Sequence, residues 1–276
     1  MAKLEPYVGD YYLWQYIPSK PASVIFLLLF LGATTFHFWK AWRIRARFCI
    51  PFCFGGLFEV IGYGARAACT DRTGQLMPYV VQSLFILLAP VLFAASVYMI
   101  LSRLICRVGA EQHALIRVNW MTKVFLAGDI LSFLIQGNGA GLMVMDGMAN
   151  MAKGIVIGGL MVQVVVFGLF MVTSVVFEVR MQRKPTSHDL DWRQHLYPLY
   201  AVSALIMVRS VFRVIEYAMG QEGYLLAHEW PMYVFDTVLM LAVMMIWGYR
   251  HPGGIQQDTY GEQLLPFPSL ASDHRM

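Results

Sequence analysis

The sequence predicts an all-α, polytopic membrane protein in which seven transmembrane helices form one domain. Of its 276 residues, 58% are hydrophobic and 14% are charged, whereas about a quarter of the residues of a soluble globular chain are charged. Seven runs of mainly apolar residues each reach about the twenty residues that a helix needs to cross a bilayer. Lys and Arg gather in alternate connections between these runs.

The seven runs divide the chain into a short N-terminal segment (1–21), a membrane domain (22–250) and a tail (251–276). The fourth and sixth runs hold the most polar residues, but we expect them to cross because unpaired backbone is not tolerated in lipid. The tail is rich in Pro, Gly and polar residues, which predicts disorder. The expected spans are 22–41, 49–69, 79–105, 119–142, 154–180, 197–219 and 231–249.

The distribution of positive charge predicts the orientation. One set of connections, together with the C-terminal tail, carries fourteen Lys and Arg residues, the other side carries five, and two more lie inside a span. The positive-inside rule therefore places the C-terminus in the cytoplasm and the N-terminus outside or in a lumen. The fourteen are Lys40, Arg43, Arg45, Arg47, Arg103, Arg107, Arg117, Lys123, Arg180, Arg183, Lys184, Arg193, Arg250 and Arg275; the five are Lys3, Lys20, Arg66, Arg72 and Lys153.

Polar residues recur at helical spacing inside three of the spans. The second span carries one such stripe, the fourth a second and the sixth a third, and residues three, four and seven apart project from one side of a helix. Each stripe can therefore face the interior of the bundle while the other sides of the helix meet lipid. The stripes are Glu59, Tyr63 and Arg66; Asp129, Ser132, Gln136 and Gly139; and Arg209, Arg213, Glu216 and Gly220.

Two interpretations of these stripes stay open: an ion-pair network that fixes the helix arrangement, or a ligand path. An ionised residue at a helix centre costs about 2.5–3.5 kcal/mol on insertion scales, and such residues usually mark substrate or ion pathways. Three stripes exceed what helix registration needs, so we favour a charged cavity in the outer half of the bundle. The expected substrate-binding residues are Glu59, Tyr63, Arg66, Gln82, Asp129, Gln136, Asn138, Arg209, Arg213, Glu216 and Asp236.

Other classes of site have little support in the sequence. Four cysteines are too few and too scattered for a disulfide framework. A zinc site needs several His at ligand spacing, and only His37 and His228 lie in or near spans. We expect no metal, no cofactor and no catalytic residues. The net charge of +4 is spread along loops, and we expect no nucleic-acid partner.

Five motifs in the same order resemble the fungal lipid-translocating exporters, a family named for resistance to aminocholesterol. The resemblance implies a seven-helix fungal protein of the plasma membrane, or of a vacuolar or ER membrane. It also implies a role in sphingoid-base export, resistance to toxic amphiphiles or porphyrin uptake. The motifs are "EVIGYGAR" (59–66), "QSLFILLAPVLFAASVYMILSRLI" (82–105), "GDILSFLIQGNGAG" (128–141), "RSVFRVIEY" (209–217) and "HEWPMYVFD" (228–236).

The resemblance and the stripes together favour a translocator of amphipathic, lipid-like or drug-like molecules in contact with membrane lipid. Carboxylates at Glu59, Asp129 and Asp236 could hold an amine, with Gln136 and Asn138 at its hydroxyls. A seven-helix sensor that binds the same ligands is the alternative. An intramembrane enzyme such as a lipid amidase is the third, although the sequence shows no evident Ser/His/Asp arrangement.

Overall fold

The computed structural model describes residues 14, 16–44, 49–70, 73–142, 148–183, 192–220 and 223–249, and their regular structure is entirely helical. Most of the expected N-terminal segment and the whole tail 251–276 lie outside the described residues. The long helices are α1 (Lys20–Ile44), α2 (Ile50–Cys69), α3 (Leu76–Arg107), α4 (Val118–Leu142), α5 (Ala149–Arg183) and α6 (Trp192–Met219). Two short helices lie in connections, η2 (Glu111–His113) and α7 (Tyr224–Ala227), and α8 (Trp230–Met232), η3 (Tyr233–Val238) and α9 (Leu239–Tyr249) follow one another without a break.

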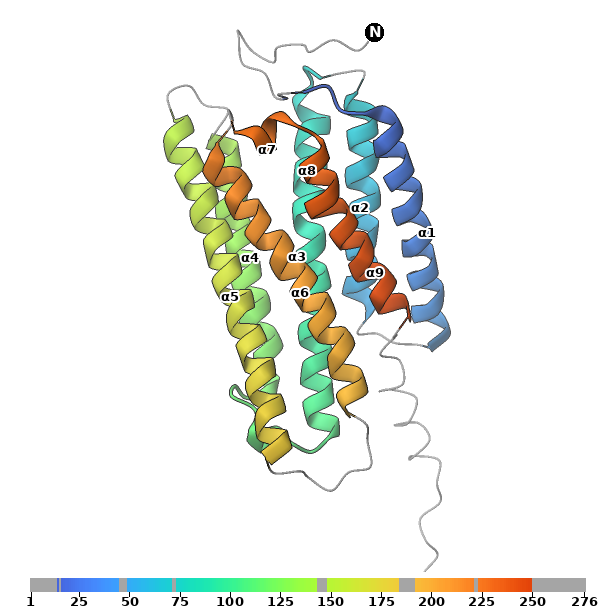
Figure 1. The fold of residues 1–276 in the computed structure, drawn as a ribbon, viewed down its shortest axis with the longest axis vertical. Helices are drawn as coiled ribbons and strands as arrows, with labels where there is room; N and C mark the ends of the chain where they lie inside the picture. Colours follow the sequence, from blue (N-terminus) through green and yellow to red (C-terminus); the bar gives the residue numbers. More distant parts are fainter. Residues whose placement is uncertain are drawn as a thin grey trace, which may run out of the picture.

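The long helices run alternately up and down through an elongated bundle (Figure 1). Helices α1 and α3 pack on α2, α4 packs on α3 and α5, and α6 packs on α3, α5 and α9. In Figure 1, α3 and α6 lie at the centre, with α4 and α5 on one side and α1, α2 and α9 on the other. The centre of the bundle is therefore lined by α3 and α6.

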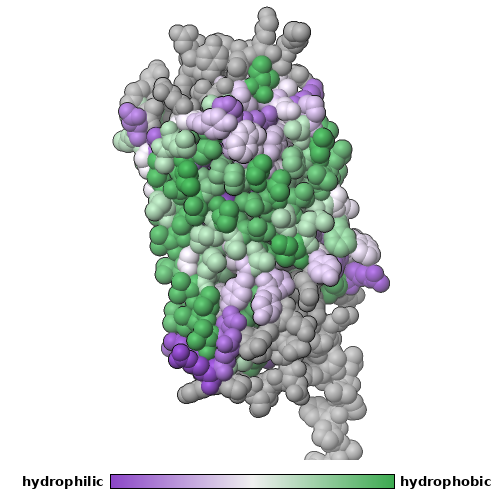
Figure 2. Space-filling view, in the orientation of Figure 1, coloured by the Kyte–Doolittle hydropathy of each residue, from purple (hydrophilic) through white to green (hydrophobic). Residues whose placement is uncertain are grey.

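Six of the described helices are long and apolar enough to cross a membrane: α1, α3, α4, α5, α6 and the combined Trp230–Tyr249 helix. On the face that Figure 2 shows, hydrophobic residues cover the middle of the molecule, and hydrophilic residues gather toward its two ends. These features identify a multi-pass membrane protein. Helix α2 is as long as a span at 20 residues, but Glu59 and Arg66 reduce its mean hydropathy.

Glycine allows α2 to approach α3 closely. A Cβ built on Gly62 would lie 2.6 Å from Cγ1 of Ile86, and one on Gly55 would lie 2.7 Å from the Phe93 ring. Real Cβ atoms do not approach other atoms this closely, so a larger residue would separate the two helices. This packing brings the Glu59 face of α2 close to the centre of the bundle.

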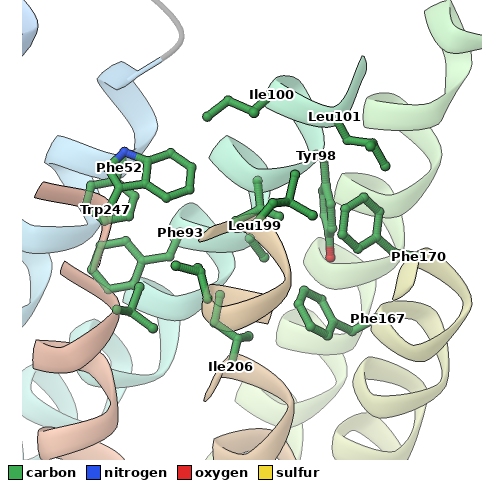
Figure 3. Packing of buried hydrophobic residues seen from close by; sticks show 14 of the residues in the cluster. Phe52, Phe93, Tyr98, Ile100, Leu101, Phe167, Phe170, Leu199, Ile206 and Trp247 are labelled. Carbon is green, nitrogen blue, oxygen red and sulfur yellow. The ribbon is translucent and has the colours of Figure 1, made fainter. Parts of the chain in front are cut away.

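Aromatic side chains fill the interior from the middle of α3 toward its C-terminal end. Phe52 and Trp247 stack with ring centroids 4.6 Å apart, and Tyr98 packs against Phe167 and Phe170 on the other side of α3 (Figure 3). This region is solid core of the kind that burial of apolar surface favours. The buried charges of α2 and α6 lie beyond it, toward the upper end in Figure 1.

Candidate functional site: a buried charge cluster

Two arginines of α6 and one aspartate of η3 form the centre of the site. Asp236 accepts hydrogen bonds from Arg209 through Oδ1 and from Arg213 through Oδ2. Arg213 also donates from Nη1 to Oε2 of Glu216, at 3.0 Å. Arg213 therefore pairs both with its own helix and across the bundle, which the sequence left undecided. Arg209 and Asp236 are each only 1% exposed.

A proline on α3 provides a further acceptor for Arg209. In a regular α-helix the carbonyl of Ile86 would bond to the N–H of residue 90, but that residue is Pro90, which has no N–H. Nη2 of Arg209 donates to this carbonyl at 2.9 Å. The planar, five-donor guanidinium can satisfy a carboxylate and a carbonyl at once, so Arg209 connects η3 to α3.

The local helix type explains how Asp236 faces inward beside another buried residue. The segment Tyr233–Val238 is a π-helix, a form that occurs mostly as short bulges at functional sites. Two consecutive residues, Asp236 and Thr237, are both buried there. Asp236 meets the arginines of α6, while the Thr237 hydroxyl hydrogen-bonds to the Tyr63 hydroxyl of α2.

Glu59 of α2 is the one carboxylate at this site with an unsatisfied oxygen. It is 1% exposed, and its Oε1 has no hydrogen-bond partner among the described residues. It lies one helical turn from Tyr63 on the same face of α2, within electrostatic range of Asp236 and of both arginines. We call Glu59, Arg209, Arg213, Glu216 and Asp236 the charge cluster.

Arg66 closes the upper end of the same α2 face. Its Nη2 donates to Oε1 of Glu229 at 2.7 Å and to the Tyr16 hydroxyl at 3.0 Å, and its guanidinium lies over the rings of Trp14 and Tyr233. Both Glu229 carboxylate oxygens accept from the backbone N–H before α1, at 3.0 Å. These contacts join the start of α1 to α2 and to the residue before α8.

The stripe of α4 makes a second, separate polar group against α3 and α5. Asp129 accepts a 2.7 Å hydrogen bond from the Tyr98 hydroxyl. Gln136 donates to Ser132 at 2.7 Å and to Gln163 at 3.2 Å. Arg209 of the charge cluster contacts Ile86 of α3, and Tyr98 lies about 18 Å from Ile86 along the axis of that helix. Asp129 is therefore not part of the charge cluster.

The structure does not bring the eleven expected substrate-binding residues into one group. The charge cluster is closed, because Glu59, Arg209 and Asp236 are each 1% exposed. The stripes also diverge, because the α4 stripe faces α3 and α5 while the α2 and α6 stripes face η3. Tyr63 and Arg66 lie beside the cluster, and Gln82 is buried on α3 with Oε1 unpartnered among the described residues. Asn138 is exposed and donates to the Leu134 carbonyl of its own helix.

Several contributing residues were not singled out from the sequence. Glu229 and Tyr233 belong to the motif "HEWPMYVFD" but lie near the end of a span, where polar residues are common and do not indicate a functional site. Tyr98 and Thr237 are uncharged and lie in apolar runs. Within the described ranges, no group of three or more His, Cys, Asp and Glu side chains is placed to hold a metal ion.

Comparisons with known proteins agree with the motifs. Residues 52–259 match the family described as RTA1 like protein. The chain is 31% identical to Protoporphyrin uptake protein 1 of Saccharomyces cerevisiae, over 86% of this chain and 91% of that protein. It is 31% identical to Protein RTA1 of the same yeast, over 87% and 84% of the two chains. It is 22% identical to the Sphingoid long-chain base transporter RSB1 of S. cerevisiae, over 86% and 72%. No solved structure matches the chain significantly.

Proposed function

Because the chain belongs to the RTA1-like family, we propose that it moves amphipathic, lipid-like molecules across the membrane. The observation that carries this proposal is the charge cluster, which places five ionisable side chains in the interior of a bundle with an apolar exterior. Ionisable residues inside a membrane domain usually mark a substrate or ion pathway. Relatives named for a sphingoid base and for a porphyrin both handle molecules with a polar part and a large apolar part.

The proposal includes seven crossings, with α2 as the seventh. Helix α2 lies between α1 and α3, both of which are long and apolar enough to cross. Its two charged residues point inward, to the cluster and to Glu229, so lipid need not solvate them. The distribution of the described Lys and Arg residues favours an orientation in which the lower end of the bundle in Figure 1 faces the cytoplasm. That end has Lys40, Arg43, Arg103, Arg107, Arg117, Lys123, Arg180 and Arg183, and the upper end has Lys20, Arg66 and Lys153.

The polar head of the substrate binds at the charge cluster, and the apolar part extends toward lipid between α6 and η3. On this seam Phe212 stacks on Phe235 with ring centroids 5.0 Å apart. These residues directly precede Arg213 and Asp236 in the sequence, and Phe235 is 37% exposed. An aromatic pair at this place separates the cluster from the acyl chains of the bilayer and can part to admit a chain. We propose the plasma membrane as the site of action.

A lipid sensor without transport activity is the second candidate, because the cluster is closed to solvent in this conformation. A sensor needs only one closed ligand-bound state, whereas a translocator must expose the same site to both leaflets in turn. Both candidates use the same cluster, so only a measurement of movement separates them.

The test is leaflet exchange in liposomes that contain the purified protein. A fluorescent long-chain primary amine is placed in one leaflet, and its transfer is timed for wild type, Glu59→Gln and the control Glu111→Gln on an exposed connection. We expect wild type and the control to accelerate exchange above protein-free vesicles and Glu59→Gln to lose the acceleration. Saturable binding of the amine with no acceleration by wild type would favour the sensor and overturn the proposal.

A further inference from the structure

We propose that Glu59 is an exchange site that holds either a proton or the cationic head of the substrate, so that one proton leaves as one cation enters. This inference rests on the proposed function and adds to it the coupling ion and the residue that carries it. It follows from the charge balance of the cluster, from the pairing inside it and from the absence of a bonding partner for Glu59 Oε1 among the described residues.

The charge balance leaves one negative charge in excess. The cluster contains three acids, Glu59, Glu216 and Asp236, and two bases, Arg209 and Arg213. Glu216 and Asp236 are both engaged by arginine, so the excess belongs to Glu59. An ionised carboxylate without a counter-charge is costly in a dry interior. Two occupants restore neutrality at Glu59, namely a proton or a cation.

Among the described residues, the basic side chains around Glu59 are already paired. Helix α6 contributes Arg209 and Arg213, which are both paired, and η3 contributes Asp236. Arg66, two turns away on α2, is bonded to Glu229. On α3, the apolar residues Ile86, Ala89 and Phe93 pack against this part of α2. On α1, Lys20 is exposed, His37 and Lys40 bond to backbone carbonyls of α9, and Arg43 lies over a Trp ring.

The pairing also decides the sign of the substrate charge. An anionic head would have to displace Asp236 or Glu216 from the arginines, leaving a further acid buried without a counter-charge. A cationic head at Glu59 displaces only a proton and leaves every ion pair in place. The cation bonds electrostatically to the Glu59 carboxylate, and the carboxyl proton goes to water on the side from which the cation came. The reverse step on the other side takes up a proton as the cation leaves.

The exchange is therefore electroneutral, and it can be followed by measuring the pH inside the vesicles. Liposomes that contain the purified protein are loaded with the pH dye pyranine, and a long-chain trimethylammonium amphiphile is added outside. This probe is permanently charged, so it carries no proton of its own across the bilayer. Its arrival in the inner leaflet is read independently by a fluorophore on its chain.

We expect the lumen of wild-type vesicles to become more alkaline as the probe arrives, with one proton lost from the lumen per probe molecule. The rate of this exchange should not change when a potassium–valinomycin clamp sets the membrane voltage. Glu59→Gln should show neither signal, Glu59→Asp should retain both, and the exposed control Glu111→Gln should behave as wild type. Probe transfer by wild type without a change in lumenal pH would overturn the exchange and leave the translocator intact. If wild type transfers neither this probe nor a primary amine, the translocator is rejected as well. The wild-type reading decides the question even if a variant fails to fold.

Discussion

Arg209 of α6 donates a hydrogen bond to the carbonyl of Ile86 in α3 at 2.9 Å, the carbonyl that Pro90 leaves without an N–H donor. The same guanidinium pairs with Asp236. One side chain thus connects three helices at the level of the charge cluster. Its two roles need donors in a fixed, planar arrangement, which arginine has and lysine lacks.

Arg209→Lys should therefore destabilise the protein although it keeps the charge. An ammonium on a flexible stem cannot serve the Asp236 carboxylate and the Ile86 carbonyl with the same geometry, so one buried acceptor loses its donor. We expect a loss of about 1–3 kcal/mol, seen as a lower midpoint of thermal unfolding in detergent. The exposed Arg117→Lys is the control. Equal midpoints for the two variants would contradict the assigned role.

Two acid-to-amide substitutions in one cluster should have different effects on stability. Asp236→Asn leaves two buried arginines with a single carboxylate between them, and loss of one partner of a buried pair costs about 3–5 kcal/mol. Glu59→Gln is neutral, as Glu59 is when it holds a proton, so it should leave the midpoint unchanged or raise it. The comparison needs thermal unfolding of both variants beside wild type. A large destabilisation by Glu59→Gln would show that this carboxylate is paired after all.

Helices α4 and α5 approach closely at Gly159. A Cβ on Gly159 would lie 2.8 Å from Cγ and 3.1 Å from the backbone nitrogen of Gln136, whereas a Cβ on Gly158 would meet nothing within 4 Å. Gly159→Ala should cost about 1–3 kcal/mol through overpacking. The adjacent Gly158→Ala should be neutral or slightly stabilising, since alanine favours a helix over glycine. Unfolding midpoints of the two variants measure this difference, and the reverse order would refute the packing.

The group around Asp129 should contribute to stability and not to exchange. Tyr98→Phe removes the only hydrogen bond described for this carboxylate, and we expect a loss of about 1–3 kcal/mol. Leaflet exchange of the amine should continue at the wild-type rate in the folded variant, because Tyr98 lies about 18 Å along α3 from the cluster level. Tyr197→Phe, at a tyrosine that is 70% exposed, is the control. Loss of exchange with unchanged stability would return Asp129 to the substrate path.

Helical periodicity allowed the sequence to predict the helices and the residues that share each face, but not which helix each face meets. The expected spans 49–69 and 119–142 lie within a residue of α2 and α4 at both ends, and the stripes of α2 and α6 meet at η3. The α4 stripe faces α3 and α5 instead, which the sequence could not predict because packing contacts set the rotation of a helix about its axis. Asn138 lies two residues beyond Gln136, and residues two apart do not share a helix face.

The pairing inside the cluster depended on two backbone irregularities. The π-helix of η3 turns Asp236 and Thr237 inward together, and an apolar run with regular spacing gives no sign of such a bulge. Pro90 was visible in the sequence, but the donor that uses the freed carbonyl comes from residue 209. Such a long-range pairing follows from the tertiary arrangement and not from local pattern.

The most direct test of the account is to locate the bound head group. A long-chain amine with a photoreactive group beside the nitrogen is bound to the purified wild-type protein and activated by light, and the labelled peptides are identified by mass spectrometry. Excess unlabelled amine serves as competitor. We expect competed labels on α2 around Glu59, on α3 around Ile86, and on α6 and η3 around Arg213 and Asp236. Competed labels confined to α4 and α5, with none at Glu59, would contradict the charge cluster as the substrate site.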